Sequence, residues 1–374
     1  MDIAITGSAM RTALGGTADT YAALLAGRSG IRPLAFVDQG QVNVRYGYHI
    51  GPVDEEGERR ASDWLTACVA EAAVQAGLDC SRQRVVAIVG TGLREMRGVE
   101  RWHAEKRTTV PATLHFGAAV RAALPGIDEV ITVSNACSAS SHALALACDL
   151  IDLGDADAVV ACGADAMAES MLAMIGRVGD GYSEAVRPFD ADRQGVLLGD
   201  GAVAVVVQRA GSSTRSELRV RGVGLSCDAH HVTAPHPPGL LAAMRDAYQR
   251  AGLIPADAGL VVAHGTGTAL NDPTEAAVLT GLFGDRPAGP RVTGIKGAIG
   301  HTSGSAGLMS LLVAGEALRH GRVPPIVGLR KPIPEAEPLD LVIDRPAPTG
   351  ATLAQVNAFG FGGVNAVCLL EVTS

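Results

Sequence analysis

Residues 133–141 read VSNACSASS, and this stretch carries a strand into a helix. The expected helix, Ser138–Leu153, is apolar or small on nearly every side, which indicates that it is buried. Cys137 would stand where the helix begins, so the free amides and positive dipole end of the helix would point at its surroundings. This position favours a thiolate with a lowered pKa, and the same amides can bind an oxyanion. We predict that Cys137 is a nucleophile; the alternative is a packed core cysteine.

Short β-branched runs alternate with longer Ala- and Leu-rich segments along the rest of the chain. The runs lack a clean apolar–polar alternation, which is typical of strands buried on both faces, so we predict an α/β fold with a helix-covered sheet. The expected strands are Asp2–Thr6, Val85–Val89, Val130–Val133, Ala158–Ala161, Ala202–Gln208, Leu218–Leu225, Leu260–Ala263, Arg291–Ile295, Ala354–Asn357 and Asn365–Glu371. The other expected helices are Ala18–Ala26, Ala61–Ala76, Leu240–Ala251, Pro273–Phe283 and Ser305–His320.

The polar stretch 209–217 (RAGSSTRSE) is the best internal boundary. We predict two similar halves on either side of it, residues 1–210 with the nucleophile and residues 218–374.

The composition excludes several classes of protein. The 374 residues carry a net charge of −8 without a basic block, which argues against general nucleic-acid binding. No stretch of about 18 apolar residues predicts a membrane span, and the start, MDIAITG, does not have the pattern of a secretory signal. The seven cysteines are an odd number and form no CxxC pair, so we expect neither a disulfide framework nor a zinc site, and we expect a cytoplasmic setting.

Two histidines follow expected strands in the second half. His264 begins HGTGT, where glycines allow close approach of a ligand and Thr266 and Thr268 place hydroxyls on one side of the loop. Lys296 and His301 lie in GIKGAIGHTSGSAG, which lacks the order of a nucleotide-binding P-loop. The alternative for His264 is a residue that only caps a turn.

The stretch 356–363 reads VNAFGFGG and places Phe359 and Phe361 among glycines. We predict a mobile aromatic element over a pocket; the alternative is a β-bulge with core aromatics. One activated thiol and two histidines from separate strand ends, 127 and 37 residues apart, would suit thioester chemistry.

These stretches together resemble the β-ketoacyl-acyl-carrier-protein synthases, the ketosynthases of the thiolase fold. The resemblance covers nearly the whole chain, through LLAGRSGI, NACSAS, RPFDADRQGVLLGDGA, HGTGT, GIKGAIGHTSGSAG and NAFGFGG. It implies a five-layered αβαβα sandwich of two similar halves, in a homodimer or in a heterodimer with a ketosynthase-like subunit. It also implies a decarboxylative Claisen condensation of an acyl thioester with a malonyl-carrier thioester.

The resemblance assigns a role to each residue that matches a family motif. Cys137 would accept the acyl chain, His264 and His301 would stabilise the enolate, and Lys296 and Glu275 would support the histidines. The amides of Cys137 and Phe361 would form the oxyanion hole. The remaining matches are the gate, formed by Phe361 and Phe359 with a second loop bearing Asp228 and His231, and the phosphopantetheine-binding hydroxyls of Thr266 and Thr268.

The resemblance further implies no metal or redox cofactor, because the phosphopantetheine arm of an acyl carrier protein delivers the substrates. That carrier is acidic in this family, so a local basic patch is needed, for which Arg59 and Arg60 are candidates; the alternative is a solvated start of a helix. Met171, Met174 and Ile175 are expected to line the acyl pocket, with core packing as the alternative.

The segment between Gly92 and Val110 is shorter than usual for the family and contains Arg94 and Arg97. Gln194 and Val196 also depart from the family pattern. These departures favour specialised or polyketide biosynthesis over housekeeping fatty-acid synthesis. Two alternatives remain: a chain-length-factor-like partner subunit, and a thiolase-fold acyltransferase that forms an ester or amide without decarboxylation.

Overall fold

The computed structural model describes residues 2–34, 37–38, 42–51, 60–106, 108, 110–176, 183–211, 218–284 and 289–373. Within these ranges the chain forms one mixed sheet of 11 strands in the order β12-β10-β9-β14-β15-β8-β1-β7-β6-β4-β5. The first half supplies β1 (Ile3–Arg11), β4 (Val85–Gly90), β5 (Glu129–Val133), β6 (Ala158–Asp165) and β7 (Gly201–Arg209). The second supplies β8 (Leu218–Cys227), β9 (Leu260–Val262), β10 (Arg291–Thr293), β12 (Asp340–Leu341), β14 (Leu353–Gly360) and β15 (Val364–Val372).

Strand β1 joins the two sets of strands. It pairs antiparallel with β7 on one side and with β8 on the other, where Ile3 lies opposite Val220. Every residue of β4 and β6 is buried, as expected for strands that are covered on both faces. Two short ladders lie apart from the main sheet: β2 (Arg32–Pro33) with β3 (Tyr46–Gly47), and β11 (Arg322–Val323) with β13 (Ala347–Pro348).

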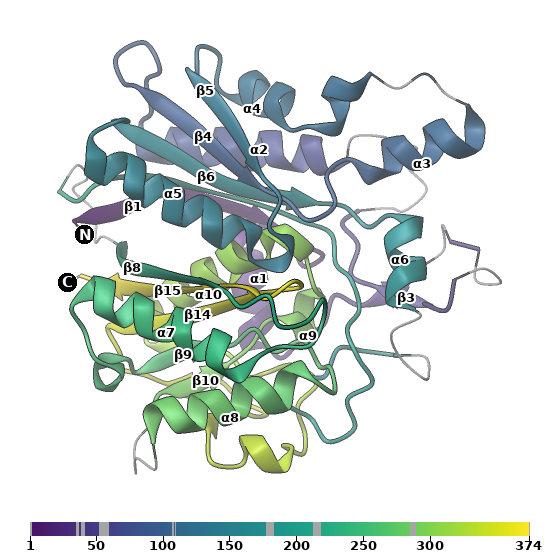
Figure 1. The fold of residues 1–374 in the computed structure, drawn as a ribbon, viewed down its shortest axis with the longest axis vertical. Coiled ribbons are helices and arrows are strands. Elements are labelled where there is room, and N and C mark those ends of the chain that lie inside the picture. Colours follow the sequence, from purple (N-terminus) through teal and green to yellow (C-terminus); the bar gives the residue numbers. More distant parts are fainter. Residues whose placement is uncertain are drawn as a thin grey trace.

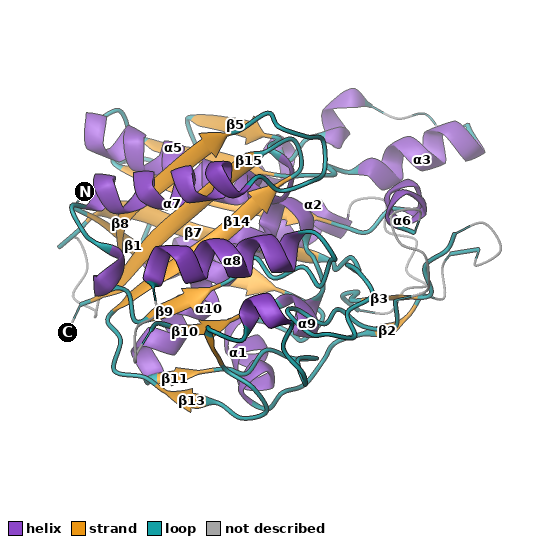
Figure 2. Cartoon of the chain, turned by 60° about the horizontal axis from the view of Figure 1, so that its bottom comes forward, coloured by secondary structure: helices purple, strands orange, loops and turns teal. Residues whose placement is uncertain are grey.

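The helices and strands form five layers (Figure 1). Helices α5 (Ala139–Leu153) and α10 (Ala306–His320) contact each other and contact strands of both halves, so they make the middle layer. Helix α2 (Arg60–Ala76), with α4 (Gly117–Ala123), covers the outer face of the first set of strands. Helices α7 (Pro237–Ala251) and α8 (Asn271–Phe283) cover the outer face of the second (Figure 2). The predicted αβαβα sandwich is confirmed.

The middle layer is apolar because its helices are buried nearly all round. In α10 every residue from Ala306 to Gly315 is buried, and in α5 the buried set includes Ala143, Leu144 and Cys148. Glycine permits the closest approach, since a Cβ on Gly90 of β4 would lie 2.4 Å from the Ser140 amide nitrogen of α5. The predicted buried helix after Cys137 is therefore confirmed.

Several short helices were not expected from the sequence. These are α3 (Met96–Glu105), α4, α6 (Glu169–Ile175) and α9 (Lys296–Ile299), whereas α1 (Thr17–Leu25) agrees with the expected helix Ala18–Ala26. Helix α3 has no buried residue and contributes nothing to the cores of the two halves. Single-turn 3₁₀ segments are η1 (Pro111–Leu114), η2 (Ala136–Ser138), η3 (Pro255–Asp257), η4 (Ser303–Ser305) and η5 (Pro334–Ala336).

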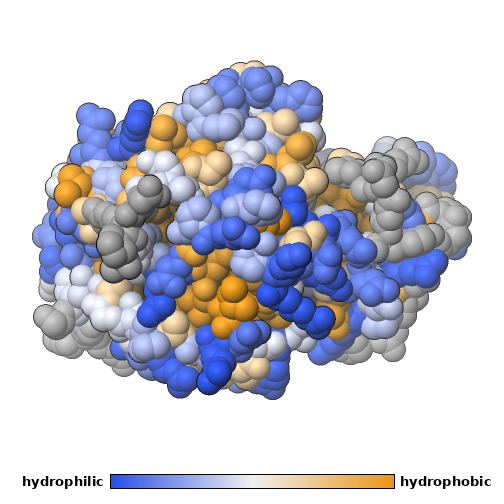
Figure 3. All heavy atoms as spheres, turned by 90° about the horizontal axis from the view of Figure 1, so that it is seen from below, coloured by the Kyte–Doolittle hydropathy of each residue, from blue (hydrophilic) through white to orange (hydrophobic). Residues whose placement is uncertain are grey.

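The surface is partly apolar. On the face seen in Figure 3, apolar residues gather in a central area bordered by hydrophilic ones. Among the described residues, no helix is both long and apolar enough to cross a membrane.

Candidate active site

Cys137 lies in η2, between β5 and the first turn of α5. The residue before it, Ala136, has a φ of 49°, a left-handed conformation that costs energy for a residue other than glycine and that shapes the sharp turn. The Cys137 side chain is partly exposed into a cavity of about 500 Å³. His264 and His301 line the same cavity, so the three predicted residues do come together.

The resting pKa of Cys137 differs from the sequence prediction. Burial raises the pKa of this thiol to about 11, although the charge of Lys296 and the backbone amides of Phe361 and Cys137 lower it. The predicted lowering is wrong because desolvation of the thiolate outweighs the amides at the start of the helix. Cys148, Cys162 and Cys368 are buried and free, as expected for core cysteines.

The backbone amides of Cys137 and Phe361 lie close enough to the Cys137 sulfur to lower the pKa of its thiol. Ser138 fixes the two segments to each other, because its hydroxyl donates to the carbonyl of Val364 at 2.8 Å and to that of Asn135 at 3.0 Å. Two converging backbone donors beside a nucleophile have the arrangement that an oxyanion hole requires.

The two histidine rings meet edge to face, with centroids 5.5 Å apart and planes at 87°. Burial lowers the pKa of both imidazoles well below 6.5, and the positive charge of Lys296 lowers it further. Both rings are therefore neutral at pH 7, and each carries one N–H. The Nδ1 atom of His301 is buried and has no hydrogen-bond partner among the described residues.

Lys296 fixes which nitrogen of His264 carries the proton. Its Nζ donates to the backbone carbonyl of His264 and lies 3.3 Å from His264 Nδ1. Burial lowers the pKa of Lys296 to about 8 while Glu275 raises it, so the amine is mostly protonated at pH 7. A protonated Lys296 makes Nδ1 an acceptor, which leaves Nε2–H of His264 as a donor.

Glu275 holds the backbone of His264 from the other side. Its two oxygens accept from the amides of His264 at 2.8 Å and Gly265 at 2.9 Å, and Asn357 donates to it at 2.9 Å. Lys296 and Glu275 thus both bind His264, the first at its carbonyl and ring and the second at its amide.

The HGTGT loop is organised by Asp272, a buried residue that the sequence analysis missed. Its carboxylate accepts from the amides of Thr266 and Gly267, both at 3.1 Å. The hydroxyls of Thr266 and Thr268 lie 2.9 Å apart, and both residues line the cavity. The expected placement of the two hydroxyls on one side of the loop agrees with this geometry.

A second buried carboxylate, Asp165 at the end of β6, was also missed. It accepts hydrogen bonds from Thr91 Oγ1 at 2.6 Å, from the Leu93 amide at 2.7 Å and from the Gly304 amide at 2.7 Å. Burial raises the pKa of Asp165 to about 6, and these hydrogen bonds oppose the rise. Asp165 ties the 91–93 loop to the loop after His301, across the two halves. The role of Asp165 could not be predicted from the sequence, because it depends on two loops that only the fold brings next to this residue.

The two phenylalanines occupy different places. Phe359 belongs to β14 and is buried, with its ring 5.6 Å from that of His264, so the prediction that it lies in a mobile loop is wrong. It is fixed there because β14 continues to Gly360 and pairs with β15 through Phe359 and Asn365. Phe361 lies in the following turn, is 42% exposed and lines the cavity.

The second predicted loop contacts this turn. Asp228 donates its amide to the carbonyl of Gly363 at 3.0 Å, and Asn365 donates to the Asp228 carboxylate at 3.0 Å. His231 is exposed, and its Nδ1 accepts from the amides of Thr233 and Ala234. Neither Asp228 nor His231 lines the cavity.

Three apolar side chains of α6, those of Met171, Met174 and Ile175, line the cavity, as expected. Gln194 and Val196 line it as well. Arg94 and Arg97 do not line it.

The predicted carrier-docking pair does not form as expected. Arg60 points inward, with its guanidinium 3.2 Å from buried Asp200 and 4.9 Å from the Trp64 ring, so its charge is already paired. Arg59 lies outside the described residues.

Sequence profiles of known families match both halves of the chain. Residues 1–212 match "Beta-ketoacyl synthase, N-terminal domain" and residues 218–330 match "Beta-ketoacyl synthase, C-terminal domain". The chain belongs to the β-ketoacyl synthase family.

Relatives within this family extend over most of the chain. Nodulation protein E of Rhizobium meliloti is 34% identical over 322 residues, which cover 79% of this chain and 78% of that protein. The 3-oxoacyl-[acyl-carrier-protein] synthase 2 of Mycobacterium bovis is 32% identical, with 97% of this chain and 95% of the relative covered. The solved structure titled "The ishigamide ketosynthase/chain length factor" is 30% identical, with a TM-score of 0.88 over 100% of this chain and 99% of that one.

Proposed function

We propose that this β-ketoacyl synthase catalyses a decarboxylative Claisen condensation between an acyl group held on Cys137 and a malonyl thioester of an acyl carrier protein. The observation that carries the proposal is the cavity that Cys137 shares with two neutral histidines, one of which has its proton directed to Nε2 by Lys296. In such a cavity the thiol can attack the carbonyl carbon of a thioester, and the imidazole N–H groups can donate to a carbonyl oxygen.

The first half-reaction loads the enzyme. The sulfur of Cys137 attacks the acyl thioester carbonyl, the amides of Cys137 and Phe361 bind the oxyanion, and the pantetheine thiol leaves with the proton that Cys137 gave up. Because the resting thiol has a pKa of about 11, we propose that deprotonation accompanies the attack rather than preceding it.

The second half-reaction forms the C–C bond. The malonyl carboxylate leaves as CO2, and the electron pair of that C–C bond becomes an enolate whose oxygen accepts N–H from His264 and His301. The enolate carbon then attacks the acyl carbonyl, the C–S bond to Cys137 breaks, and the thiolate that is released takes up a proton from solvent. Neutral imidazoles suit this role because both histidines are buried and act as preorganised donors.

We further propose that Thr266 and Thr268 hold the phosphopantetheine arm, and that the reaction uses no metal or redox cofactor. Asp228, His231 and Phe361 would act as the gate through which that arm enters, since their two loops are hydrogen-bonded to each other. Met171, Met174 and Ile175 would contact the acyl chain. The lining of the same cavity includes Gln194 and Val196, which supports a substrate outside housekeeping fatty-acid synthesis, in specialised or polyketide biosynthesis.

An acyl carrier protein is the proposed macromolecular partner, on the strength of the name of the Mycobacterium bovis relative. The proposed assembly is a homodimer, or a heterodimer with a ketosynthase-like subunit of the kind named in the ishigamide structure. We propose residues 1–210 and 218–374 as the two halves, and the cytoplasm as the compartment in which the seven thiols stay free.

Intact-protein mass spectrometry tests the proposal. After incubation with an acyl-carrier protein we expect a covalent acyl adduct on the wild type and none on Cys137→Ala; Cys80→Ala, which removes a partly exposed thiol outside the cavity, should retain the adduct. A wild type that never acylates would reject the proposed function and leave the partner-subunit alternative.

A further inference from the structure

Helix α6 supplies part of the apolar lining of the cavity, since Met171, Met174 and Ile175 all lie on it. The helix has seven residues, and its N-cap residue, Ala168, offers no side-chain hydrogen bond to the first turn. A helix this short has little stability of its own, so its position depends on what holds its ends.

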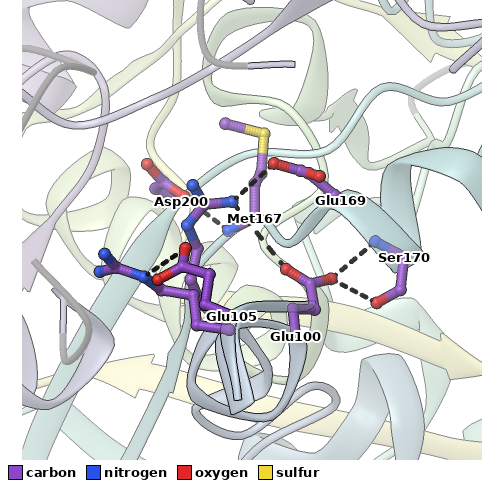
Figure 4. A network of polar contacts seen from close by, with 8 residues as sticks. Glu100, Glu105, Met167, Glu169, Ser170 and Asp200 are labelled. Carbon is purple, nitrogen blue, oxygen red and sulfur yellow. Dashed lines mark hydrogen bonds and ion pairs between the residues drawn. The ribbon is translucent and has the colours of Figure 1, made fainter. Parts of the chain in front are cut away.

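The missing cap comes from α3. Glu100 Oε1 accepts from the Ser170 amide at 2.7 Å and from the Ser170 hydroxyl at 2.6 Å (Figure 4). Arg97, one turn earlier on α3, lies 3.2 Å from Glu169 and 3.9 Å from the second oxygen of Glu100. A carboxylate at the N-terminus of a helix also interacts favourably with the helix dipole.

The flanks of α6 are held as well. The Met167 amide donates to buried Asp200 at 2.7 Å, which fixes the chain before the helix. At the other end, Asn43 donates to the Gly176 carbonyl at 3.2 Å, and a Cβ on Gly176 would lie 3.0 Å from the Asn43 carbonyl oxygen. The side of the first turn that faces α3 is held by Glu100 and Arg97.

We infer that Glu100 is a positioning residue for acyl specificity: by capping α6 from the neighbouring helix, it sets where Met171, Met174 and Ile175 lie and so how the cavity receives a long acyl chain. The inference rests on the proposed function, because it requires acylation of Cys137. The inference also assigns a role to the segment between Gly92 and Val110, because this segment contains Glu100, which caps α6.

The test compares how fast Cys137 is acylated by an octanoyl- and by an acetyl-carrier protein. An acetyl group extends only two carbons from Cys137, so we expect its transfer to depend on α6 less than transfer of an octanoyl chain, for which α6 supplies apolar lining. We expect Glu100→Ala to lower the octanoyl-to-acetyl ratio of acylation rates about tenfold, which is the size expected for the loss of a charge-assisted hydrogen bond, while the acetyl rate stays within about twofold of wild type.

Two further variants make the test specific. Glu100→Gln keeps an acceptor for Ser170 and should restore most of the ratio, and Ser170→Ala, which removes one hydrogen bond from the other side, should lower the ratio by about threefold. Glu105→Gln is the matched control, because it removes a carboxylate of α3 that pairs with Arg101 on the same helix, and its ratio should equal that of wild type.

The result that overturns the inference is an unchanged ratio in both Glu100→Ala and Ser170→Ala, or an equal loss of the two rates in both variants, since a purely structural role lowers both together. If Glu100→Ala does not fold, Ser170→Ala decides the question by the same ratio. A wild type that accepts neither acyl group would instead reject the proposed function itself. That outcome differs from one in which the wild type is acylated and Glu100→Ala has the same ratio of rates, which rejects only the inference about Glu100.

Discussion

At the scale of single residues, the position of Cys137 could be predicted from the sequence but its ionisation could not. The end of an apolar run followed by small residues is visible in the sequence, and it marks the turn from strand to helix. The pKa of the thiol depends instead on the atoms that exclude water from it, which come from both halves of the chain. The same limit applies to Arg60, whose partner Asp200 lies 140 residues away.

His301 separates the two half-reactions. We expect His301→Ala to keep acylation of Cys137 and to lower the rate of malonyl decarboxylation by about 10²–10³, the usual cost of one preorganised donor. Release of CO2 from malonyl-carrier protein measures it. His320→Ala, an exposed histidine at the end of α10, is the control; an undiminished CO2 release in His301→Ala would remove this residue from the mechanism.

The ionisation of Lys296 predicts an alkaline limit. Above about pH 8 the folded protein loses the Lys296 proton, so His264 Nδ1 faces a neutral amine, a weaker donor that can also accept, in place of an ammonium group, and we expect the decarboxylation rate to fall. Lys296→Met should be slow at every pH and should lack this fall. A wild-type rate that stays level from pH 7 to pH 9.5, recorded as CO2 release, would contradict the assignment.

While the decarboxylation rate falls above pH 8, the contribution of Lys296 to the free energy of unfolding should increase. The folded pKa of Lys296, about 8, lies below the 10.5 of an ordinary lysine, so between these values the unfolded chain holds a proton that the folded chain lacks. The contribution of this group to the free energy of unfolding therefore rises with pH there. A fall in rate above pH 8 is thus not explained by unfolding through Lys296.

At the scale of elements, long and strongly patterned segments were predictable, and the elements held by distant contacts were not. The buried strands and the helices α5 and α10 carry an apolar pattern along their whole length. Helix α6 instead depends on Glu100 of α3, about 70 residues away, and its own sequence has no capping residue. Phe359 was misplaced because the glycines around it suggested a loop, whereas β15 continues the pairing to Gly360.

The link between loops 91–93 and 303–305 gives the prediction at this scale. Asp165→Asn replaces a carboxylate that accepts from both loops with a group that has one acceptor oxygen, and each buried N–H left unpaired costs about 1–3 kcal/mol. We expect a lower free energy of unfolding in urea and a reduced rate of decarboxylation. Asp155→Asn, at an exposed aspartate, is the control. Equal stability of Asp165→Asn and wild type would show that this link is not needed.

At the scale of the whole molecule, the sequence predicted two halves with the nucleophile in one and the histidines in the other. The structure adds how they meet: β1 pairs with β8, and α5 and α10 lie between the two sets of strands. This arrangement brings residues 127 and 164 positions apart from Cys137, the two histidines, to one cavity. The shape of that cavity could not be predicted, because segments from both halves line it.

The measurement that tests the central claim most directly is the mass of the carrier-bound product after acyl-loaded protein reacts with malonyl-carrier protein. The account predicts a β-ketoacyl chain two carbons longer than the starting acyl group, formed with one CO2 for each chain and lost in Cys137→Ala. Transfer of the acyl group to another acceptor without release of CO2, with no elongated chain on the carrier, would contradict it.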